Sequence, residues 1–208
     1  MPLTPDEVFE CEAWTRGFRR VAGLDEVGCG PLAGPVVAAA VILPRRCRAL
    51  IGLRDSKRLN KLQRERFYEL IRRVAVGCGV GIIDAKVIDA VNIRQAARLA
   101  MEYAVRQLSP PPDFLILDAI RLPQVRIEQR MVIKGDGLCL SVAAASVIAK
   151  VTRDRLMAEA DVRFPQYGFL AHKGYGTAEH LRRLRRYGPC TLHRRSFRPV
   201  RKAETRWA

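Results

Sequence analysis

Residues 21–43 have the sequence VAGLDEVGCGPLAGPVVAAAVIL, in which two apolar runs flank a turn rich in glycine and proline. The first run, Val21–Val27, predicts a strand. The second run, 36–43, also predicts a strand, because the prolines and glycines on both sides limit it to strand length. Residues 28–31 predict the turn between them, since glycine accepts a positive φ and proline interrupts strand pairing. An acidic pair interrupts the first strand.

The sequence on the C-terminal side of these strands predicts alternating helices and strands. Helices are expected where apolar residues recur on one stripe, and strands where short apolar runs end at turns. The expected helices are 61–76, 84–90, 92–108, 140–157 and 177–187; the further strands are 77–83, 114–118 and, at an edge, 126–134. A turn is expected at 135–137, a loop at 164–176 and a basic tail after 188. This order predicts an α/β fold with a mixed sheet.

The length of 208 residues, 49% of them hydrophobic, predicts one domain with a sizeable core and an extension. We divide it into a lead-in at 1–19, irregular or briefly helical, a core at 20–160 and a basic helical extension at 161–208. Apolar runs shorter than about 18–20 residues predict no membrane span. Four acids within the first 14 residues argue against a secretory signal. Six cysteines without a CxxC pair predict neither a zinc site nor disulfides, which fits the cytoplasm.

The charge of the chain indicates a polyanionic partner. Lys and Arg number 37 against 21 Asp and Glu, which gives a net charge of +16. The basic residues are concentrated after residue 171, where aromatic and small residues lie among them, as in HKGYGT and HRRSFRPV. Such a mixture suits a nucleic-acid backbone and its sugars. The alternative is a solvated, arginine-rich tail.

Acidic residues stand out in this basic chain. Asp25 and Glu26 lie inside an apolar strand, Asp118 ends the strand FLILD, and Asp136 lies in the turn KGDG. Ion pairs with arginine would explain any one of them, and turn chemistry would explain Asp136. Together, however, they offer the oxygen ligands that Mg²⁺ and Mn²⁺ prefer. Two such ions about 3.5–4 Å apart could activate a water and stabilise a leaving oxygen.

One difficulty concerns the acidic pair. Neighbouring residues on a straight strand point to opposite faces, so Asp25 and Glu26 would face one metal only if the strand twists or bulges, or if a backbone carbonyl contributes. Gly23 and Gly28 would permit such a bend.

Long blocks of the chain resemble the bacterial type 2 ribonuclease H family, ribonuclease HII. They are VAGLDEVGCGPLAGPVVAAAVIL, LRDSKRLN, LILDA, VIKGD, AAASVIAKVTRD, FPQYGFLAHKGYGT and HRRSF, in the family's order from about residue 20 to 200. The resemblance implies a ribonuclease H-like mixed five-stranded sheet flanked by helices, with a C-terminal helical extension. The related type 3 enzyme carries an extra N-terminal domain, whereas 24 residues precede Asp25 here.

The resemblance also implies an activity and a metal requirement. The family cleaves the RNA strand of RNA–DNA hybrids and incises on the 5′ side of single ribonucleotides in duplex DNA, leaving 3′-hydroxyl and 5′-phosphate ends. Its four catalytic and metal-binding acids would fall on Asp25, Glu26, Asp118 and Asp136, with Asp25 bridging two Mn²⁺ or Mg²⁺ ions. An attacking water would serve as the nucleophile.

Substrate contacts are implied by the same resemblance. The turn Gly28-Cys29-Gly30 would read the 2′-hydroxyl that separates RNA from DNA, largely through backbone groups. Tyr175, in KGYG, would pack on the sugar of the following deoxynucleotide; the alternative is a packed loop aromatic. Further contacts to the nucleic-acid backbone are expected from Ser56 and Lys57 in the DSK loop. Weaker candidates for the same contacts are Lys150, Arg153, His172 and Lys173. For these four, the alternative is a charge that is solvated or that pairs within a helix.

Two departures from the family pattern stand out. Cys29 occupies the place of the family's arginine, and a thiol is only a weak donor. A hydrogen bond to a charged group contributes about 1.5–3 kcal/mol. We therefore expect weaker reading of the ribonucleotide, with the flanking glycines retained. The second departure, Gly137 where a serine more often follows the acid, carries little weight.

Two other functions fit parts of the pattern. A non-catalytic nucleic-acid-binding protein would show no dependence on Mg²⁺, and a junction resolvase of the same superfamily would cut substrates without any ribonucleotide. The complete set of four acids and the KGYG segment argue against both. A monomer is expected, since nothing in the sequence suggests a coiled coil. The sequence does not decide whether the chain contacts a replication protein such as a sliding clamp. It contains no convincing glutamine-led clamp motif.

Overall fold

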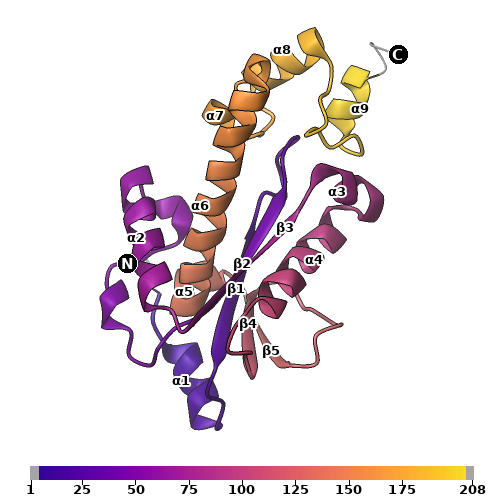
Figure 1. The fold of residues 1–208 in the computed structure, drawn as a ribbon. Helices are drawn as coiled ribbons and strands as arrows, with labels where there is room; N and C mark the ends of the chain where they lie inside the picture. Colours follow the sequence, from indigo (N-terminus) through magenta and orange to yellow (C-terminus); the bar gives the residue numbers. More distant parts are fainter. Residues whose placement is uncertain (1–4, 205–208) are drawn as a thin grey trace.

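The computed structural model describes residues 5–204 and contains a five-stranded mixed sheet (Figure 1). The strands are β1 Val21–Val27, β2 Val36–Ile42, β3 Gly77–Ile83, β4 Phe114–Asp118 and β5 Glu128–Val132. Their order is β3-β2-β1-β4-β5, with β1, β2 and β3 antiparallel and with β4 and β5 parallel to β1. Residues 1–4 and 205–208, the ends of the expected lead-in and extension, lie outside the described residues. The expected mixed five-stranded sheet is confirmed.

Helices cover both faces of the sheet. The helices α3 Ala85–Val91 and α4 Ile93–Arg106 pack on one face, and α2 Lys61–Val74 and α6 Leu140–Arg163 pack on the other. Alternate residues of β2 therefore enter two separate cores: Ala38 and Ala40 face α4, whereas Val37 and Ala39 face α6. This two-sided burial explains why the second strand is apolar at every position. Figure 1 shows the sheet between the two pairs of helices.

The helices lie unusually close to the sheet at glycines. A Cβ added at Gly23 of β1 would lie 2.2 Å from the backbone carbon of Ser141, at the start of α6. A Cβ at Gly81 of β3 would lie 1.9 Å from the carbonyl oxygen of Ala100 in α4. Any larger residue at these two positions would push a helix away from the sheet, and at Gly23 it would displace the strand that carries the acidic pair.

Local sequence sets the helix starts. Asn60 begins α2 with a capping box, in which its side chain accepts from Gln63 N and the Gln63 side chain accepts from Asn60 N. Asp84 and Asn92 cap α3 and α4 in the same general manner, with side-chain oxygens accepting from backbone N–H groups. The predicted helices 61–76, 84–90 and 92–108 therefore agree with the structure to within two residues at each end.

Three predictions about the later elements were wrong. The expected turn at 135–137 is a short helix, α5 Gly135–Leu138. The helix expected to end at 157 continues to Arg163, and its C-terminal end buries Met157 and Ala160 against Tyr167 and Phe169 of the extension. The expected basic tail contains α9 Arg198–Glu204, whose Val200 and Ala203 are buried against Leu32 and Leu184. The lead-in contains α1 Val8–Thr15.

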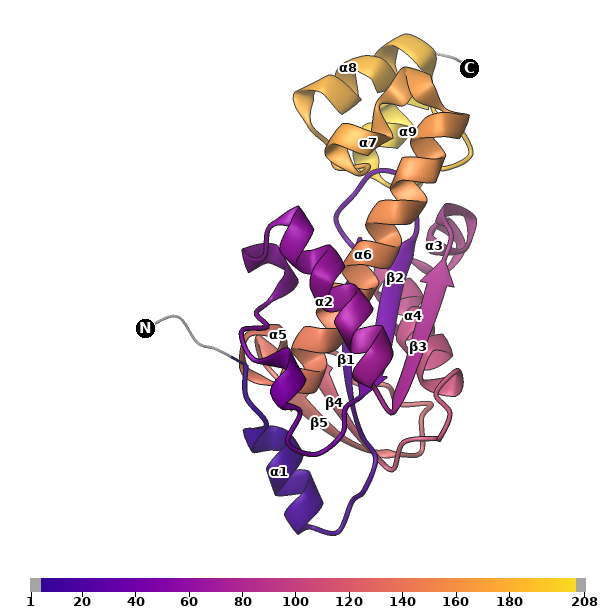
Figure 2. The ribbon, with the colours of Figure 1, turned by 60° about the vertical axis from the view of Figure 1, so that its left-hand side comes forward.

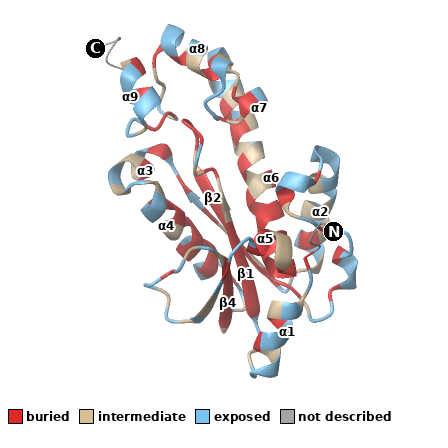
Figure 3. Ribbon diagram, turned by 180° about the vertical axis from the view of Figure 1, so that it is seen from behind, coloured by how far each residue is buried: buried red, intermediate tan, exposed pale blue. Residues whose placement is uncertain are grey.

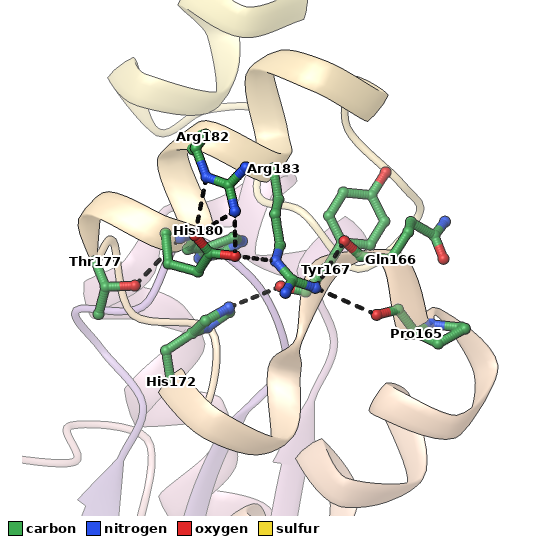
Figure 4. A network of polar contacts seen from close by, with 9 residues as sticks. Pro165, Gln166, Tyr167, His172, Thr177, His180, Arg182 and Arg183 are labelled. Carbon is green, nitrogen blue, oxygen red and sulfur yellow. Dashed lines mark hydrogen bonds and ion pairs between the residues drawn. The ribbon is translucent and has the colours of Figure 1, made fainter.

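The C-terminal extension forms a layer around the last turns of α6 (Figure 2). It consists of a 3₁₀ turn at Pro165–Tyr167, α7 Phe169–His172, α8 Ala178–Tyr187 and α9, so the expected loop at 164–176 is partly helical. Figure 4 shows polar contacts that join its parts: Arg183 donates to the carbonyls of Pro165 and Gln166, and His172 contacts the Tyr167 carbonyl. Within residues 5–204, no helix is long and apolar enough to cross a membrane.

Candidate active site

Two of the predicted site carboxylates lie next to each other because of strand register. β1 and β4 are parallel, and Leu24 pairs with Leu117. The next residue of each strand is an aspartate, so Asp25 and Asp118 lie side by side at the carboxyl ends of neighbouring strands. Asp25 is buried and Asp118 is half-buried. The strands that carry them, β1 and β4, are largely buried along their length (Figure 3). Carboxyl ends of parallel strands are a frequent location for ligand sites in open α/β sheets.

The third carboxylate approaches from α5. Asp136 is buried there, and the preceding backbone N–H, of Gly135, donates to Oδ1 of Asp118 across 3.2 Å. The short helix thus ties the KGDG segment to the end of β4. Lys57 lies on the solvent side of this group, with its Nζ 3.2 Å from Oδ2 of Asp136 and its side chain 76% exposed.

The fourth carboxylate, Glu26, remains on the opposite face of β1. Pairing with β2 runs without interruption from Ala22 to Val27, so β1 contains no bulge that would turn both acids the same way. The backbone N–H of Glu26 donates to Oδ1 of Asp25 at 2.8 Å, and the thiol of Cys29 contacts Oε1 of Glu26 at 3.8 Å. The bend that the flanking glycines would permit is therefore absent within the strand.

The four carboxylates still share one electrostatic environment. Burial raises the pKa of Asp25 well above its ordinary value, and the negative charges of the other three carboxylates raise it further. Burial also raises the pKa of Glu26, with the charge of Asp118 as the next cause. The pKa of Asp118 is raised chiefly by burial, partly opposed by the hydrogen bond from Gly135. In a protein of net charge +16, this is a concentrated negative region.

Such a region fits a hard divalent cation in its donor chemistry. All four ligand candidates are carboxylates, whose oxygens suit Mg²⁺ or Mn²⁺, and a bound cation would relieve the repulsion that raises these pKa values. Within residues 5–204, no three Asp, Glu, His or Cys side chains form a ready-made ligand cluster.

The predicted substrate turn lies beside Tyr175. Gly28 has a φ of +97°, as expected for a glycine turn, and Gly30 is exposed. A Cβ at Gly30 would lie 3.8 Å from Cε1 of Tyr175, and this tyrosine is 44% exposed. The two segments, about 145 residues apart in sequence, thus form one continuous surface between the sheet and the extension.

Comparison with known proteins agrees with this architecture. A family model described as Ribonuclease HII matches residues 22–200. The chain belongs to the ribonuclease HII family. It is 52% identical over 190 residues to a ribonuclease HII of Acetivibrio thermocellus, a match that covers 91% of this chain and 74% of the relative. It is 56% identical over 193 residues to that of Geobacillus kaustophilus, with 93% and 74% covered.

Solved structures agree on the fold. The chain is similar to the ribonuclease H2 of Pyrococcus horikoshii, with a TM-score of 0.78 and 25% identity, covering 91% of this chain and 99% of that one. It is also similar to a structure of a PCNA:RNase HII complex from Archaeoglobus fulgidus, with a TM-score of 0.71, 25% identity and coverages of 85% and 94%. The protein is therefore a hydrolase of the ribonuclease H class.

Three predicted substrate contacts of this ribonuclease lie where a ligand could reach them. Lys57 is exposed beside Asp136, and Lys173 is partly exposed at the end of α7. Lys150 is less accessible, because its Nζ pairs with Asp154 across 2.7 Å one turn further along α6. Ser56 is buried instead, and its hydroxyl accepts a hydrogen bond from Ser146 at 2.7 Å. It anchors the DSK loop on α6.

Two residues that were predicted to contact the nucleic-acid backbone are buried in the structure. Arg153 is fully buried, and its guanidinium donates to the carbonyls of Ala33 and Pro35 at 3.2 and 3.0 Å. His172 is buried too: its Nε2 lies 2.9 Å from the Tyr167 carbonyl, and its Nδ1 accepts from Gly174 N. The sequence marks both residues as polar, but it does not show that residues 33–35 cover Arg153 or that the C-terminal extension encloses His172.

Sequence reasoning did not assign roles to three further polar residues. Arg194 is fully buried, and its guanidinium contacts the carbonyls of the substrate turn. His180 and His193 are buried and lie 3.0 Å apart between their Nε2 atoms. The block HRRSF contains two of these residues, yet a basic segment at the end of a basic chain gives no sign that one of its arginines is internal.

Proposed function

We propose that this enzyme is a metal-dependent endonuclease that cleaves the RNA strand of RNA–DNA hybrids. It also incises on the 5′ side of single ribonucleotides in duplex DNA and leaves 3′-hydroxyl and 5′-phosphate ends. The observation that carries the proposal is the adjacency of Asp25 and Asp118 on two parallel strands, with Asp136 held against Asp118 by the Gly135 hydrogen bond. This arrangement occurs in a chain of the ribonuclease HII family.

Asp25, Glu26, Asp118 and Asp136 are the residues that would hold two divalent cations, Mg²⁺ or Mn²⁺. When bound, such ions supply an activated nucleophilic water and charge stabilisation for the leaving oxygen. The carboxylates would determine where these cations, and with them the reacting phosphate, lie at the ends of β1 and β4. Asp25 is central, because its pKa is raised by the charges of all three partners.

Lys57 is the first basic group outside the carboxylates. Its ammonium group contacts Asp136 and its side chain is largely exposed, so it can exchange this contact for a substrate phosphate. Lys173, and more weakly Lys150, would follow the backbone of the nucleic acid. Phosphate contacts of this kind position the duplex and make binding weaken as salt increases.

Discrimination of RNA from DNA would come from the turn Gly28-Cys29-Gly30 and from Tyr175. The backbone of the turn is the element that can approach a 2′-hydroxyl closely, because its glycines carry no side chain. The exposed ring of Tyr175 offers a flat surface for the sugar of the next, deoxy, nucleotide. Because the turn and Tyr175 lie close together, they could contact a ribonucleotide and the deoxynucleotide that follows it at the same time.

We propose that the protein acts as a monomer in the cytoplasm, where its six free cysteines would remain reduced. The relative from Archaeoglobus fulgidus has been seen in complex with PCNA. A sliding clamp or another replication protein is therefore a partner to test for this chain as well.

The deciding experiment uses a labelled DNA duplex with one ribonucleotide, incubated with enzyme and Mg²⁺ or Mn²⁺. A long RNA–DNA hybrid and an all-DNA duplex run beside it. We expect incision 5′ of the ribonucleotide and cleavage of the hybrid, both absent in EDTA and in Asp118→Asn. Product ends are checked by ligation and by phosphatase treatment.

The remaining arms separate the alternatives. Cutting of the all-DNA duplex would favour a resolvase-like nuclease. Binding of all three substrates without cleavage under either metal would favour a non-catalytic role and would defeat the proposal. Cleavage of the hybrid alone would support the metal site but would contradict the proposed recognition of a single ribonucleotide in duplex DNA.

A further inference from the structure

A buried guanidinium hydrogen-bonds to the backbone of the substrate turn, residues Gly28–Gly30. Arg194, in the extension, is 0% exposed. Its Nη2 donates to the carbonyl of Gly28 at 2.6 Å and its Nη1 donates to that of Cys29 at 3.1 Å. Nε and Nη2 both donate to the carbonyl of Gly34, at 3.1 and 2.9 Å. One side chain thus fixes both the beginning and the end of the connection between β1 and β2.

A second buried guanidinium links the same connection to the tyrosine. Arg153 of α6 is also 0% exposed, and it donates to the carbonyls of Ala33 and Pro35. Its Cζ lies 6.0 Å from the ring centroid of Tyr175, and its Nη1 has no hydrogen-bond partner. A guanidinium at this distance from an aromatic ring is attracted to the ring's face.

The backbone completes the connection between the two regions. Leu32 N donates to the carbonyl of Gly174 at 2.8 Å, and Gly34 N donates to that of Leu192 at 2.8 Å. Arg194 N in turn donates to the carbonyl of Leu32 at 2.9 Å. Residues 28–35 are therefore bound on one side to the segment that carries Tyr175 and on the other to the segment that carries Arg194.

These two arginines are costly in purely structural terms. Burial lowers the pKa of Arg194 to about 10 and also lowers the pKa of Arg153, which reflects the loss of hydration around each cation. Carbonyl dipoles accept their hydrogen bonds. A planar fork of five donors can hold several carbonyls at once in fixed directions, which an ammonium group cannot do.

We propose that Arg153 and Arg194 form a positioning pair that sets the placement of the Gly28–Gly30 turn relative to Tyr175. The pair thereby determines the preference of the enzyme for a ribonucleotide followed by a deoxynucleotide. This inference rests on the proposed function. Neither arginine touches substrate; each acts through the residues that do.

The physical reason lies in how the two substrates differ. At a single embedded ribonucleotide, the turn must meet the ribose while Tyr175 meets the following deoxyribose, so the separation of the two elements matters. In a uniform hybrid, the following sugar also carries a 2′-hydroxyl, and this paired fit is not available. An error of about 1 Å in placement can reduce a rate by up to about 100-fold. Loosening the pair should therefore reduce the junction reaction more than the hybrid reaction.

The test compares conservative variants with matched controls. Arg194→Lys and Arg153→Lys retain a positive charge but lose the fork of donors. Arg195→Lys and Arg155→Lys are the controls, since these neighbours are exposed and pair with Glu204 and with acids of α2. For each protein, kcat and KM are measured on a duplex with one ribonucleotide and on a uniform hybrid, at a temperature well below the lowest Tm of the set.

We expect kcat/KM on the junction duplex to fall about 10-fold or more in Arg194→Lys and Arg153→Lys. On the hybrid it should fall less than about 3-fold, and the control variants should keep the wild-type ratio of the two activities. A merely structural role would reduce both reactions by the same factor. An unchanged ratio in both variants would therefore overturn the inference.

Failure of the inference is separable from failure of the proposed function. A wild-type enzyme that cleaves neither substrate defeats the function, whereas a wild type that cleaves both, with variants of unchanged ratio, defeats the positioning pair alone. If Arg194→Lys does not fold, Arg153→Lys decides by the same ratio. If neither variant folds, the pair is an element of stability and the inference is wrong.

Discussion

The thiol of Cys29 donates a hydrogen bond to Oε1 of Glu26 across 3.8 Å. Burial, and then the charge of Glu26, raises the pKa of Cys29 to about 12, so the side chain remains a neutral thiol at ordinary pH. The turn therefore presents backbone groups to a substrate, but no charged side chain of its own. At this position the resemblance to ribonuclease HII leads us to expect an arginine.

Replacing the thiol by a guanidinium should strengthen the junction reaction. We expect Cys29→Arg to raise kcat/KM on a duplex with one ribonucleotide about 10-fold, because a hydrogen bond to a charged group contributes about 1.5–3 kcal/mol. Steady-state kinetics on that duplex measures the effect. Cys29→Ser is the control, since it retains a small neutral donor and should remain near wild type. An unchanged or lower kcat/KM in Cys29→Arg would show that the thiol does not weaken the reaction of this enzyme at a single ribonucleotide.

Asp25 carries the strongest electrostatic strain in the candidate site, since burial and three neighbouring carboxylates all raise its pKa. Asp25→Asn removes this repulsion, so the metal-free protein should gain about 1 kcal/mol, or a Tm rise of about 2–4 °C. The same change should reduce cleavage by more than about 100-fold, because Asp25 is one of the proposed metal ligands. Thermal unfolding in EDTA measures the first effect, and the junction assay measures the second.

Metal binding gives this prediction a readout that does not depend on activity. Mg²⁺ that binds the folded state should raise the Tm of wild type in a concentration-dependent way, and it should do so much less in Asp25→Asn. Glu65→Gln on the surface of α2 is the control and should keep the wild-type response. An equal Mg²⁺ response in wild type and Asp25→Asn would exclude Asp25 from the ligands.

The sheet was predictable because its strands are short apolar runs ended by glycine, proline or acid. Val21–Val27, Gly77–Ile83 and Phe114–Asp118 have the predicted bounds. Strand pairing then brings Asp25 and Asp118 together. All four acids were grouped from their residue types, and the resemblance to a known family implied the same set. The residue types alone establish the chemistry of each acid, whereas the adjacency of the acids depends on strand register.

The interior of the extension was not predictable from local sequence. Arg153, His172 and Arg194 are ordinary surface residues by type, and they are internal because the extension packs on α6 and on residues 28–35. Each arginine is tolerated inside because backbone carbonyls, distant in sequence, accept its hydrogen bonds. A pattern within one segment contains no information about carbonyls more than 100 residues away.

Gly23 links fold and site, because it lies two residues before Asp25 and directly under α6. A Cβ there would overlap the backbone of Ser141 and Val142, neither of which can rotate away. We expect Gly23→Ala to lower the free energy of unfolding by about 1–3 kcal/mol through overpacking. The shifted strand should also reduce cleavage. Urea unfolding and the junction assay measure the two effects.

A second glycine serves as the control for this substitution. A Cβ at Gly137 would have no heavy atom within 4 Å, and its φ lies outside the left-handed region. Gly137→Ala should therefore leave the free energy of unfolding within about 0.5 kcal/mol of wild type. A Gly23→Ala protein as stable as Gly137→Ala would mean that α6 does not lie against β1 at this point.

The histidines of the extension make its stability depend on pH. The imidazoles of His180 and His193 contact each other, His172 stacks on His180 with 4.3 Å between ring centroids, and Nδ1 of His180 lies 2.9 Å from the Tyr175 carbonyl. Burial is the main cause that lowers the pKa of His180 to about 4 and that of His193 to about 3. Both are neutral in the folded protein at pH 7.

The sign of the pH effect is set by these lowered pKa values. Between about pH 6.5 and 3 the unfolded chain binds protons at these histidines that the folded chain does not, so stability is complete above pH 6.5 and declines as the pH falls. At pH 5 we expect a loss of about 2 kcal/mol from each histidine relative to pH 7, or on the order of 4 kcal/mol from the pair. The buried carboxylates, with raised pKa values, act in the opposite direction, so the wild-type curve alone is not diagnostic. His193→Gln isolates the effect: its free energy of unfolding, measured in urea, should change less between pH 7 and pH 5 than that of wild type. A variant curve parallel to the wild-type curve would contradict a neutral, buried histidine pair.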